Sequence, residues 1–376
     1  MNYLYITAMF FLIITGCVTQ FIPETDEQES SLVVEGLITD QPGIYTVKLA
    51  KSVPLAANIS KEMLTGCTVI ISDNLNNQVR LAETSPGVYT TRENEFRGQT
   101  GRIYRLQIET NSPELLNKTY ESLPMEMNPV PVIDTIYYKK LDTETDDEGK
   151  VLKQACQVYL NTFDKSGSCE FYRWDFSETW MFRLPYDVQN QICWITKPSR
   201  SILIKTTSVL SENRIEKMPV NYITGETDRL SEKYSININQ YSLNEDEFNY
   251  WERLRNVSEN VGGLYDITPV SIPGNIYCNE DPYEQVLGYF SVSAVSSKRL
   301  FIKDGFEGVA HLYGECPADT IYGDEAIPGL GETTWIIINS SFSRPPFKVT
   351  TNYERCADCT ISGTNVEPLF WREDNQ

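Results

Sequence analysis

Short runs of alternating apolar and polar residues, separated by turn residues, recur through most of this chain of 376 residues. The first run spans 32–39 and is followed by Asp40-Gln41-Pro42-Gly43, where proline and glycine occupy positions that a turn favours. Because successive side chains of a strand point to opposite faces, this period of two predicts half-buried β-strands. We expect further strands at 44–49, 67–72, 87–91, 102–109, 132–141, 151–162, 170–183, 201–207, 233–241, 285–295 and 299–303.

The spacing of these runs predicts a mainly β fold in two parts. Short strands at regular intervals over residues 32–129 indicate an immunoglobulin-like antiparallel β-sandwich. Prolines are clustered between residues 124 and 131, which places a boundary near residue 130. We therefore expect a second, larger β-rich domain over residues 130–376.

One prominent helix is expected in the second domain, near residues 243–261. Ser242 and Glu245 have the spacing of a capping box, in which each side chain bonds to the backbone at the start of a helix. Phe248, Trp251 and Leu254 recur on one face. The rest of the helix is polar, so we expect it to lie on a sheet.

The first residues predict export and lipid attachment. Met1–Cys17 contains no charged residue, and its apolar run, Tyr3–Ile14, is shorter than the ~20 residues that span a bilayer as a helix. The run ends in Ile14-Thr15-Gly16-Cys17, which resembles a lipobox. We expect residues 1–16 to be a signal peptide, Cys17 to carry lipid and 17–31 to form a flexible acidic tether. The alternative is an ordinary signal peptide in which Cys17 is incidental.

The charge balance excludes some partners. The chain has 52 acidic and 32 basic residues, which give a net charge of −20. Such a surface repels phosphate backbones and anionic lipid head groups, so we expect no nucleic-acid partner. Contact with a membrane is therefore expected through the N-terminal lipid.

Removal of the lipidated residue from the nine cysteines leaves an even number, which favours disulfides in an exported chain. Eight cysteines allow 105 pairings, and the sequence does not choose among them. Cys356-Ala-Asp-Cys359 could instead be half of a zinc site, but a second such pair is absent and we expect no metal. The candidate disulfide cysteines are Cys67, Cys156, Cys169, Cys193, Cys278, Cys316, Cys356 and Cys359.

Enzyme motifs are missing. The chain lacks the patterns GxSxG, HExxH, GxGxxG and the P-loop, so we expect no cofactor and lean against an enzyme. The one histidine, His311, lies in Gly308–Tyr313, which reads as a strand. A structural, hydrogen-bonded histidine is the interpretation that we favour there.

The aromatic run 171–183 is the strongest local lead. Period two places Glu178 on the same face as Trp174 and Trp180. A carboxylate buried there needs an arginine, a hydroxyl or a β-bulge, because an unpaired buried charge costs several kcal/mol. Such a carboxyl beside aromatic rings could be a glycosidase acid or part of a sugar-binding surface. The alternative, which we favour, is a paired structural glutamate.

A second candidate ligand-binding segment surrounds Asn275 and Tyr277, where turns are rich in polar and aromatic groups.

Six blocks of the sequence carry a resemblance to a known family: 33–43 with 45–47, Arg173-Trp174 with 178–180, 274–277, 286–292, 356–360 and the final Phe370-Trp371. Together they resemble the Bacteroidetes outer-membrane lipoproteins classed as domain of unknown function four-two-four-nine. The resemblance implies an outer-membrane location and a gene that commonly lies beside those for TonB-dependent receptors, and it implies no catalytic or ligand residues.

Three functions follow as hypotheses. The first is a non-enzymatic lipoprotein that faces the cell exterior and helps a TonB-dependent transporter to capture or present a nutrient of unknown identity. The second is a surface hydrolase that acts on glycans or peptides, and the third is a structural or adhesive module. Asp134-Thr135-Ile136 and Asp319-Thr320-Ile321 also resemble the sites at which these bacteria O-glycosylate exported proteins, which makes Thr135 and Thr320 candidates for modification.

Overall fold

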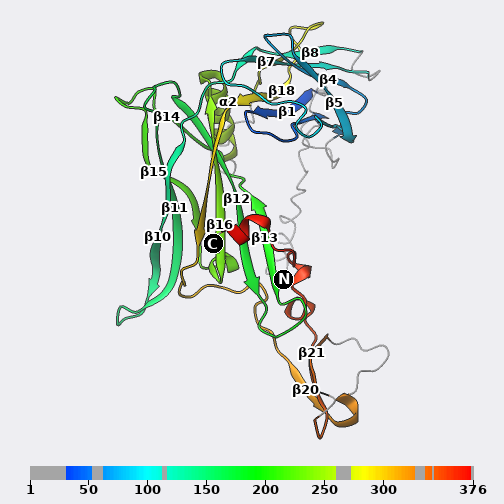
Figure 1. Ribbon diagram of the computed structural model, residues 1–376, viewed down its shortest axis with the longest axis vertical. Helices are drawn as coiled ribbons and strands as arrows, with labels where there is room; N and C mark the ends of the chain where they lie inside the picture. The colour runs from blue at the N-terminus through cyan, green and yellow to red at the C-terminus, as the bar shows by residue number, and fades with distance from the viewer. Residues whose placement is uncertain are drawn as a thin grey trace, which may run out of the picture.

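Strands are the dominant secondary structure of the described residues, which confirms the predicted mainly β fold (Figure 1). An N-terminal sheet lies at one end of an elongated body, a β-sandwich forms the middle, and a small sheet lies at the other end. The computed structural model describes residues 31–52, 62–111, 117–259, 272–326, 335–340 and 343–373.

The N-terminal sheet has eleven strands in the order β17-β8-β7-β4-β5-β6-β2-β1-β18, with β3 beside β2 and β9 beside β7. It continues through β5, which pairs with both β4 and β6, and encloses one core in which Tyr89, Tyr104 and Tyr120 are buried. This arrangement does not confirm the expected immunoglobulin-like sandwich, which has two separate antiparallel sheets. Its strands are β1 (Leu32–Thr39), β2 (Thr46–Lys51), β3 (Glu62–Met63), β4 (Thr68–Asp73), β5 (Gln78–Ser85), β6 (Val88–Thr90), β7 (Ile103–Glu109), β8 (Thr119–Ser122), β9 (Met125–Glu126), β17 (Ile276–Cys278) and β18 (Leu287–Ser293).

Two strands of this sheet return from far along the chain. β18 pairs in parallel with β1, and β17 pairs with β8. Gly288 has a φ of +87° and lies so close to β1 that an added Cβ would be 1.9 Å from the carbonyl oxygen of Val34. The N-terminal unit is therefore built from two separate stretches, which a single boundary near residue 130 does not describe.

The middle of the molecule is a β-sandwich of two sheets. One sheet has the order β10-β11-β15, and the other has the order β13-β12-β16-β19 with β14 beside β12. Their facing sides form one core, to which Val158 and Leu160 contribute from the first sheet and Trp174 and Ile236 from the second. These strands are β10 (Ile133–Thr145), β11 (Val151–Phe163), β12 (Phe171–Arg183), β13 (Ile192–Pro198), β14 (Leu203–Thr206), β15 (Arg214–Ile223), β16 (Lys233–Leu243) and β19 (Val295–Ile302).

The expected helix is present as α2 (Glu245–Glu259) and lies where the two units meet. Its cap differs from the expected one, because the Asn244 side chain accepts the backbone N–H of Glu247 at 2.8 Å. Ser242 instead donates to the carbonyl oxygen of Asn128 and accepts the N–H of Ala294, so it joins the segments that connect the units. Among the described residues, no helix is long and apolar enough to cross a bilayer.

The C-terminal part forms a small three-stranded sheet in the order β20-β22-β21 and then runs back along β13. The last helix returns to the sandwich, where Trp371 is buried and packs edge-on against Phe301 of β19. The remaining elements are η2 (Asp228–Leu230), β20 (Asp319–Tyr322), η3 (Gly323–Ala326), β21 (Trp335–Ser340), β22 (Phe347–Thr351), η4 (Glu354–Cys356), η5 (Cys359–Ile361) and α3 (Leu369–Glu373).

Candidate functional site

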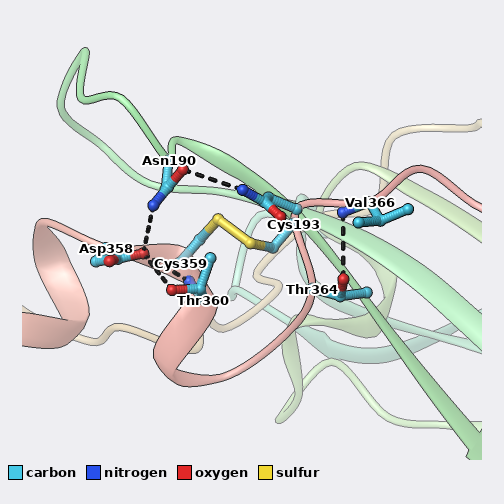
Figure 2. The surroundings of a disulfide bond; sticks show 8 residues. Asn190, Cys193, Asp358, Cys359, Thr360, Thr364 and Val366 are labelled. Carbon is cyan, nitrogen blue, oxygen red and sulfur yellow. Dashed lines mark hydrogen bonds between the residues drawn. A yellow bond between two sulfur atoms is a disulfide. The ribbon is translucent and has the colours of Figure 1, made fainter.

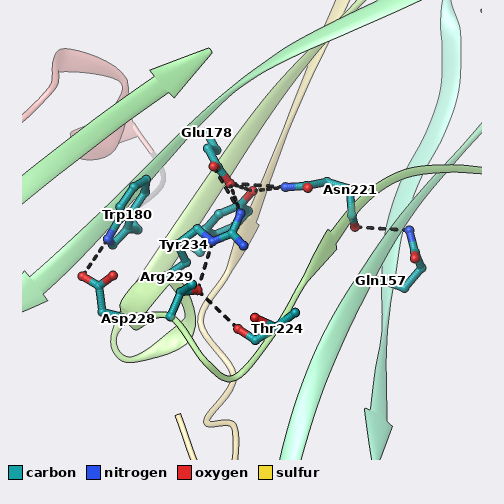
Figure 3. A network of polar contacts seen from close by, with 9 residues as sticks. Gln157, Glu178, Trp180, Asn221, Thr224, Asp228, Arg229 and Tyr234 are labelled. Carbon is teal, nitrogen blue, oxygen red and sulfur yellow. Dashed lines mark hydrogen bonds and ion pairs between the residues drawn. The ribbon is translucent and has the colours of Figure 1, made fainter. Parts of the chain in front are cut away.

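Glu178 of β12 is the centre of a buried polar network (Figure 3). Its carboxylate accepts hydrogen bonds from Arg229 at 3.0 and 3.2 Å, from the Tyr234 hydroxyl at 2.8 Å and from the Asn221 amide at 3.2 Å. The side chain is on the aromatic face, as the alternation predicts, and it has both an arginine and a hydroxyl as partners. These contacts offset the cost of burying the charge.

The network joins the two sheets of the sandwich at one end. Asn221 comes from β15, and Tyr234 comes from β16 on the opposite sheet. Arg229 lies in η2, the short turn of helix between them. Burial, and then the neighbouring Glu178 carboxylate, raise the pKa of Tyr234 well above its ordinary value, so this hydroxyl acts as a donor.

Trp180, two residues further along β12, carries a second buried polar contact. Its indole N–H donates to Asp228 at 2.9 Å, and the ammonium of Lys197 on β13 lies 5.4 Å from its ring centroid. Since Trp180 is only 3 % exposed, its ring is a wall rather than an open stacking platform. Asp228 and Lys197 were not expected at the site from sequence.

A pocket of about 690 Å³ opens beside these residues. That volume is in the range of ligand sites, roughly 300–1,000 Å³. A smaller pocket of about 210 Å³ shares Asp228, His311 and Leu312 with it, so the two form adjoining parts of one groove. The larger pocket is lined by Glu178, Trp180, Ile195, Lys197, Glu226, Thr227, Asp228, Arg229, Ala310, His311, Leu312 and Ser362.

His311 reaches this groove from a loop, so the expected strand over 308–313 is wrong. Gly308 has a φ of +66°, and the carbonyl oxygen of His311 accepts the N–H of Gly314 in a turn. Both features interrupt an extended run. The His311 ring stacks on Tyr313 with centroids 5.1 Å apart, and its side chain is exposed. The sole histidine therefore lies at the groove.

The C-terminal tail forms part of the rim. Backbone hydrogen bonds join Trp194 of β13 to Thr364 in both directions, and a disulfide joins Cys193 to Cys359 in the same region. Figure 2 shows the Asn190 amide donating to Asp358 beside this disulfide, at 3.1 Å. These links hold Ser362 against the pocket.

The structure brings together only some of the residues that the sequence nominated. Trp174, Glu178 and Trp180 share one face of β12, but Trp174 is 1 % exposed and donates to Gln240 in the core. Asn275 and Tyr277 lie in the N-terminal sheet. The buried Asn275 side-chain amide donates to the carbonyl oxygen of Phe290 on β18 and accepts its N–H. It thus takes the place of the backbone of a neighbouring strand.

Tyr277 is exposed on β17, where its hydroxyl contacts Glu121 at 3.3 Å. It does not line the groove.

The eight cysteines divide into two groups. Disulfides join Cys193 to Cys359 and Cys316 to Cys356, so the two cysteines of the CxxC motif have different partners. Burial raises the pKa of the Cys156 and Cys169 thiols to about 12. Cys67, Cys156, Cys169 and Cys278, which were also candidates for pairing, are free.

Three further predictions concern modification and metal. Cys17 and the tether lie outside the described residues. Thr135 is exposed on β10 and accepts a hydrogen bond from Asn161, and Thr320 is exposed on β20. O-glycosylation at these two residues stays a prediction. The described part of the chain contains no group of three or more potential metal ligands.

The fold and the groove define a two-unit β protein with a polar pocket at one end of a sandwich. The family model described as domain of unknown function (DUF4249) matches residues 18–299, which is more than half of the chain, and the protein belongs to this family. A comparison with curated proteins finds no significant match. The matched stretch contains Glu178, Asp228 and Arg229, whereas His311 and Ser362 lie beyond it.

Proposed function

We propose that this protein is a non-enzymatic outer-membrane lipoprotein that faces the cell exterior and captures a nutrient for a TonB-dependent transporter. The groove beside Trp180 is the capture site. The observation that carries this proposal is the pocket of about 690 Å³, whose polar wall is already fixed by internal hydrogen bonds. Such a wall keeps its shape without a ligand, which lowers the cost of binding.

Two other features support the proposed location outside the cytoplasm. The sequence Ile14-Thr15-Gly16-Cys17 has the form of a lipobox, and an acidic tether follows it. Two disulfides connect distant parts of the chain, and structural disulfides persist mainly outside the cytoplasm. A lipid on Cys17 would leave the body free to reach a receptor in the same membrane.

The test uses the tagged full-length chain in its native host. We expect palmitate labelling and outer-membrane recovery for the wild type, and loss of both for Cys17→Ala. From detergent-solubilised membranes, the wild type is expected to co-purify with a TonB-dependent receptor. Labelled protein that reproducibly elutes alone would contradict the transport partnership, and unlabelled wild type would contradict the anchor.

A surface hydrolase is the second candidate, because Glu178 and Asp228 line the same pocket and glycosidases use two carboxyl groups. The contacts of Glu178 weigh against it: all three donors use the carboxylate as an acceptor, and they fix its position. Glu178→Gln separates the candidates. Unchanged thermal stability with loss of turnover on a glycan or peptide substrate would favour the hydrolase.

A further inference from the structure

The charged groups of the groove differ in whether the protein already satisfies them. Glu178 accepts from Arg229, Tyr234 and Asn221, and Asp228 accepts from Trp180. Glu226 is ion-paired with Lys153. The three carboxylates that line the larger pocket therefore each have an internal donor.

Two polar side chains of the same pocket, Lys197 and His311, can donate hydrogen bonds to a ligand. Lys197 is exposed and, within the described part of the chain, forms no ion pair; its ammonium lies over the Trp180 ring. The His311 ring has only its stacking contact with Tyr313 among the described residues. Both side chains line the pocket together with the apolar Ile195 and Leu312. A ligand that complements this wall supplies a hydrogen-bond acceptor with negative charge and an uncharged remainder.

The neighbouring carboxylates limit how much negative charge a ligand can carry. Two like charges about 4 Å apart repel by roughly 4 kcal/mol near a protein surface, and a dianion carries twice the charge of a carboxylate. Glu178, Glu226 and Asp228 line the pocket. They therefore disfavour a phosphate ester or polyanion more strongly than a single carboxylate. The volume of about 690 Å³ suits a small organic molecule.

We propose that the groove beside Trp180 binds a small organic monocarboxylate, whose carboxylate contacts Lys197 and His311 and whose uncharged part packs against Ile195 and Leu312. This inference rests on the proposed capture function and specifies its ligand class. Lys197 provides the charge, and His311 provides a second donor in the same pocket.

The test measures binding to the full-length, detergent-solubilised protein by calorimetry. The probes are matched pairs that differ in the carboxylate: glucuronate with glucose, N-acetylleucine with N-acetylleucinamide, and phenylacetate with phenylacetamide. Glucose 6-phosphate serves as the dianion. We expect at least one carboxylate to bind, its neutral partner to bind about tenfold more weakly or worse, and the affinity to fall as salt is added.

Two lysine variants make the test specific. Lys197→Gln is expected to weaken carboxylate binding about tenfold. Lys205→Gln, an exposed residue of β14 outside the pocket, makes the same change in net charge and is expected to have no effect. Equal binding of a neutral partner, tighter binding of glucose 6-phosphate, binding by none of the carboxylates, or an unaffected Lys197→Gln would each overturn the inference.

The outcome is separable from that of the transport proposal. Carboxylate binding by a chain that never co-purifies with a receptor would leave this inference standing and remove the partnership. Co-purification with a receptor without carboxylate binding would support the partnership and overturn this inference.

Discussion

One guanidinium nitrogen of Arg229 donates to both carboxylate oxygens of Glu178, at 3.2 and 3.0 Å, inside the sandwich. The two side chains are only 19 % and 12 % exposed. Their pairing fixes η2 against β12 and so forms one wall of the groove.

Replacement of this glutamate tests its structural role. Glu178→Gln keeps an acceptor for Tyr234 but leaves Arg229 without a counter-charge, so we expect the free energy of unfolding to fall by about 3 kcal/mol. Denaturant unfolding measures the change. The control is Glu226→Gln, which removes an exposed ion-pair partner of Lys153 and is expected to cost less than about 1 kcal/mol. Equal effects of the two variants would contradict a structural role for Glu178.

Glu247 on α2 predicts a pH dependence of stability. Its side chain is fully buried, and this burial raises its pKa to about 7 against the opposing effects of Arg173 and the Trp251 indole. The unfolded chain releases this proton near pH 4.5, so the folded form binds more protons between the two values. The stability contribution is fully present below pH 4.5 and is lost as the pH rises through 7, a change of about 3 kcal/mol.

Chemical unfolding at pH 5 and pH 8 checks this expectation. Glu247→Gln should remove part of the loss seen in the wild type between these pH values, and the exposed Glu245→Gln on the same helix should not. Both variants replace one carboxyl group of the same helix by an amide, so their difference isolates the buried group. A wild-type slope that Glu247→Gln leaves intact would show that other groups cause it.

The Cys193–Cys359 disulfide closes a separation of 166 residues and attaches the tail to β13. A loop of that length corresponds to about 5 kcal/mol in the chain-entropy description. We expect Cys193→Ser with Cys359→Ser to lower the melting temperature and to expose the tail to limited proteolysis. Cys67→Ser, which replaces a free thiol, is expected to do neither. A cleavage pattern like that of the wild type would mean that the tail is held by other contacts.

Gly288 tests the return of β18 to the N-terminal sheet. An alanine there would need the left-handed φ of +87° and would place its Cβ 1.9 Å from the carbonyl oxygen of Val34. We expect Gly288→Ala to destabilise the protein by about 2–4 kcal/mol and to speed hydrogen exchange in β1. Gly305→Ala meets no atom within 4 Å and should be nearly neutral. Slow exchange in β1 of the Gly288 variant would refute this dependence.

Local pattern predicted local structure well and long-range partners poorly. Alternation along 171–183 placed Glu178 on the aromatic face and required an arginine or a hydroxyl near it. Arg229 and Tyr234, which meet that need, come from segments more than fifty residues later, and period two carries no information on which strands meet. The polar turn Thr227-Asp228-Arg229 between two strands was the available sequence signal for these partners. Its role is apparent only from its contact with β12.

The same limit applies to the other misjudged segments. The apolar run around His311 has strand composition, but Gly308 and the following turn stop it from extending. Asn275 looked like an exposed polar loop residue because its backbone partner, Phe290, is on another strand. For the cysteines, parity indicated pairing, whereas which of them pair depends on the path of the tail.

The parallel pairing of β1 with β18 has a consequence for how the protein is made. As the chain is synthesised the N-terminal strands emerge first, and β1 lacks its parallel neighbour until the chain has emerged past Ser293. In that interval an unpaired strand edge rich in valine and leucine is open to the wrong partners. This edge of β1 is closed only when β18 pairs with it, so the sheet is completed late in synthesis.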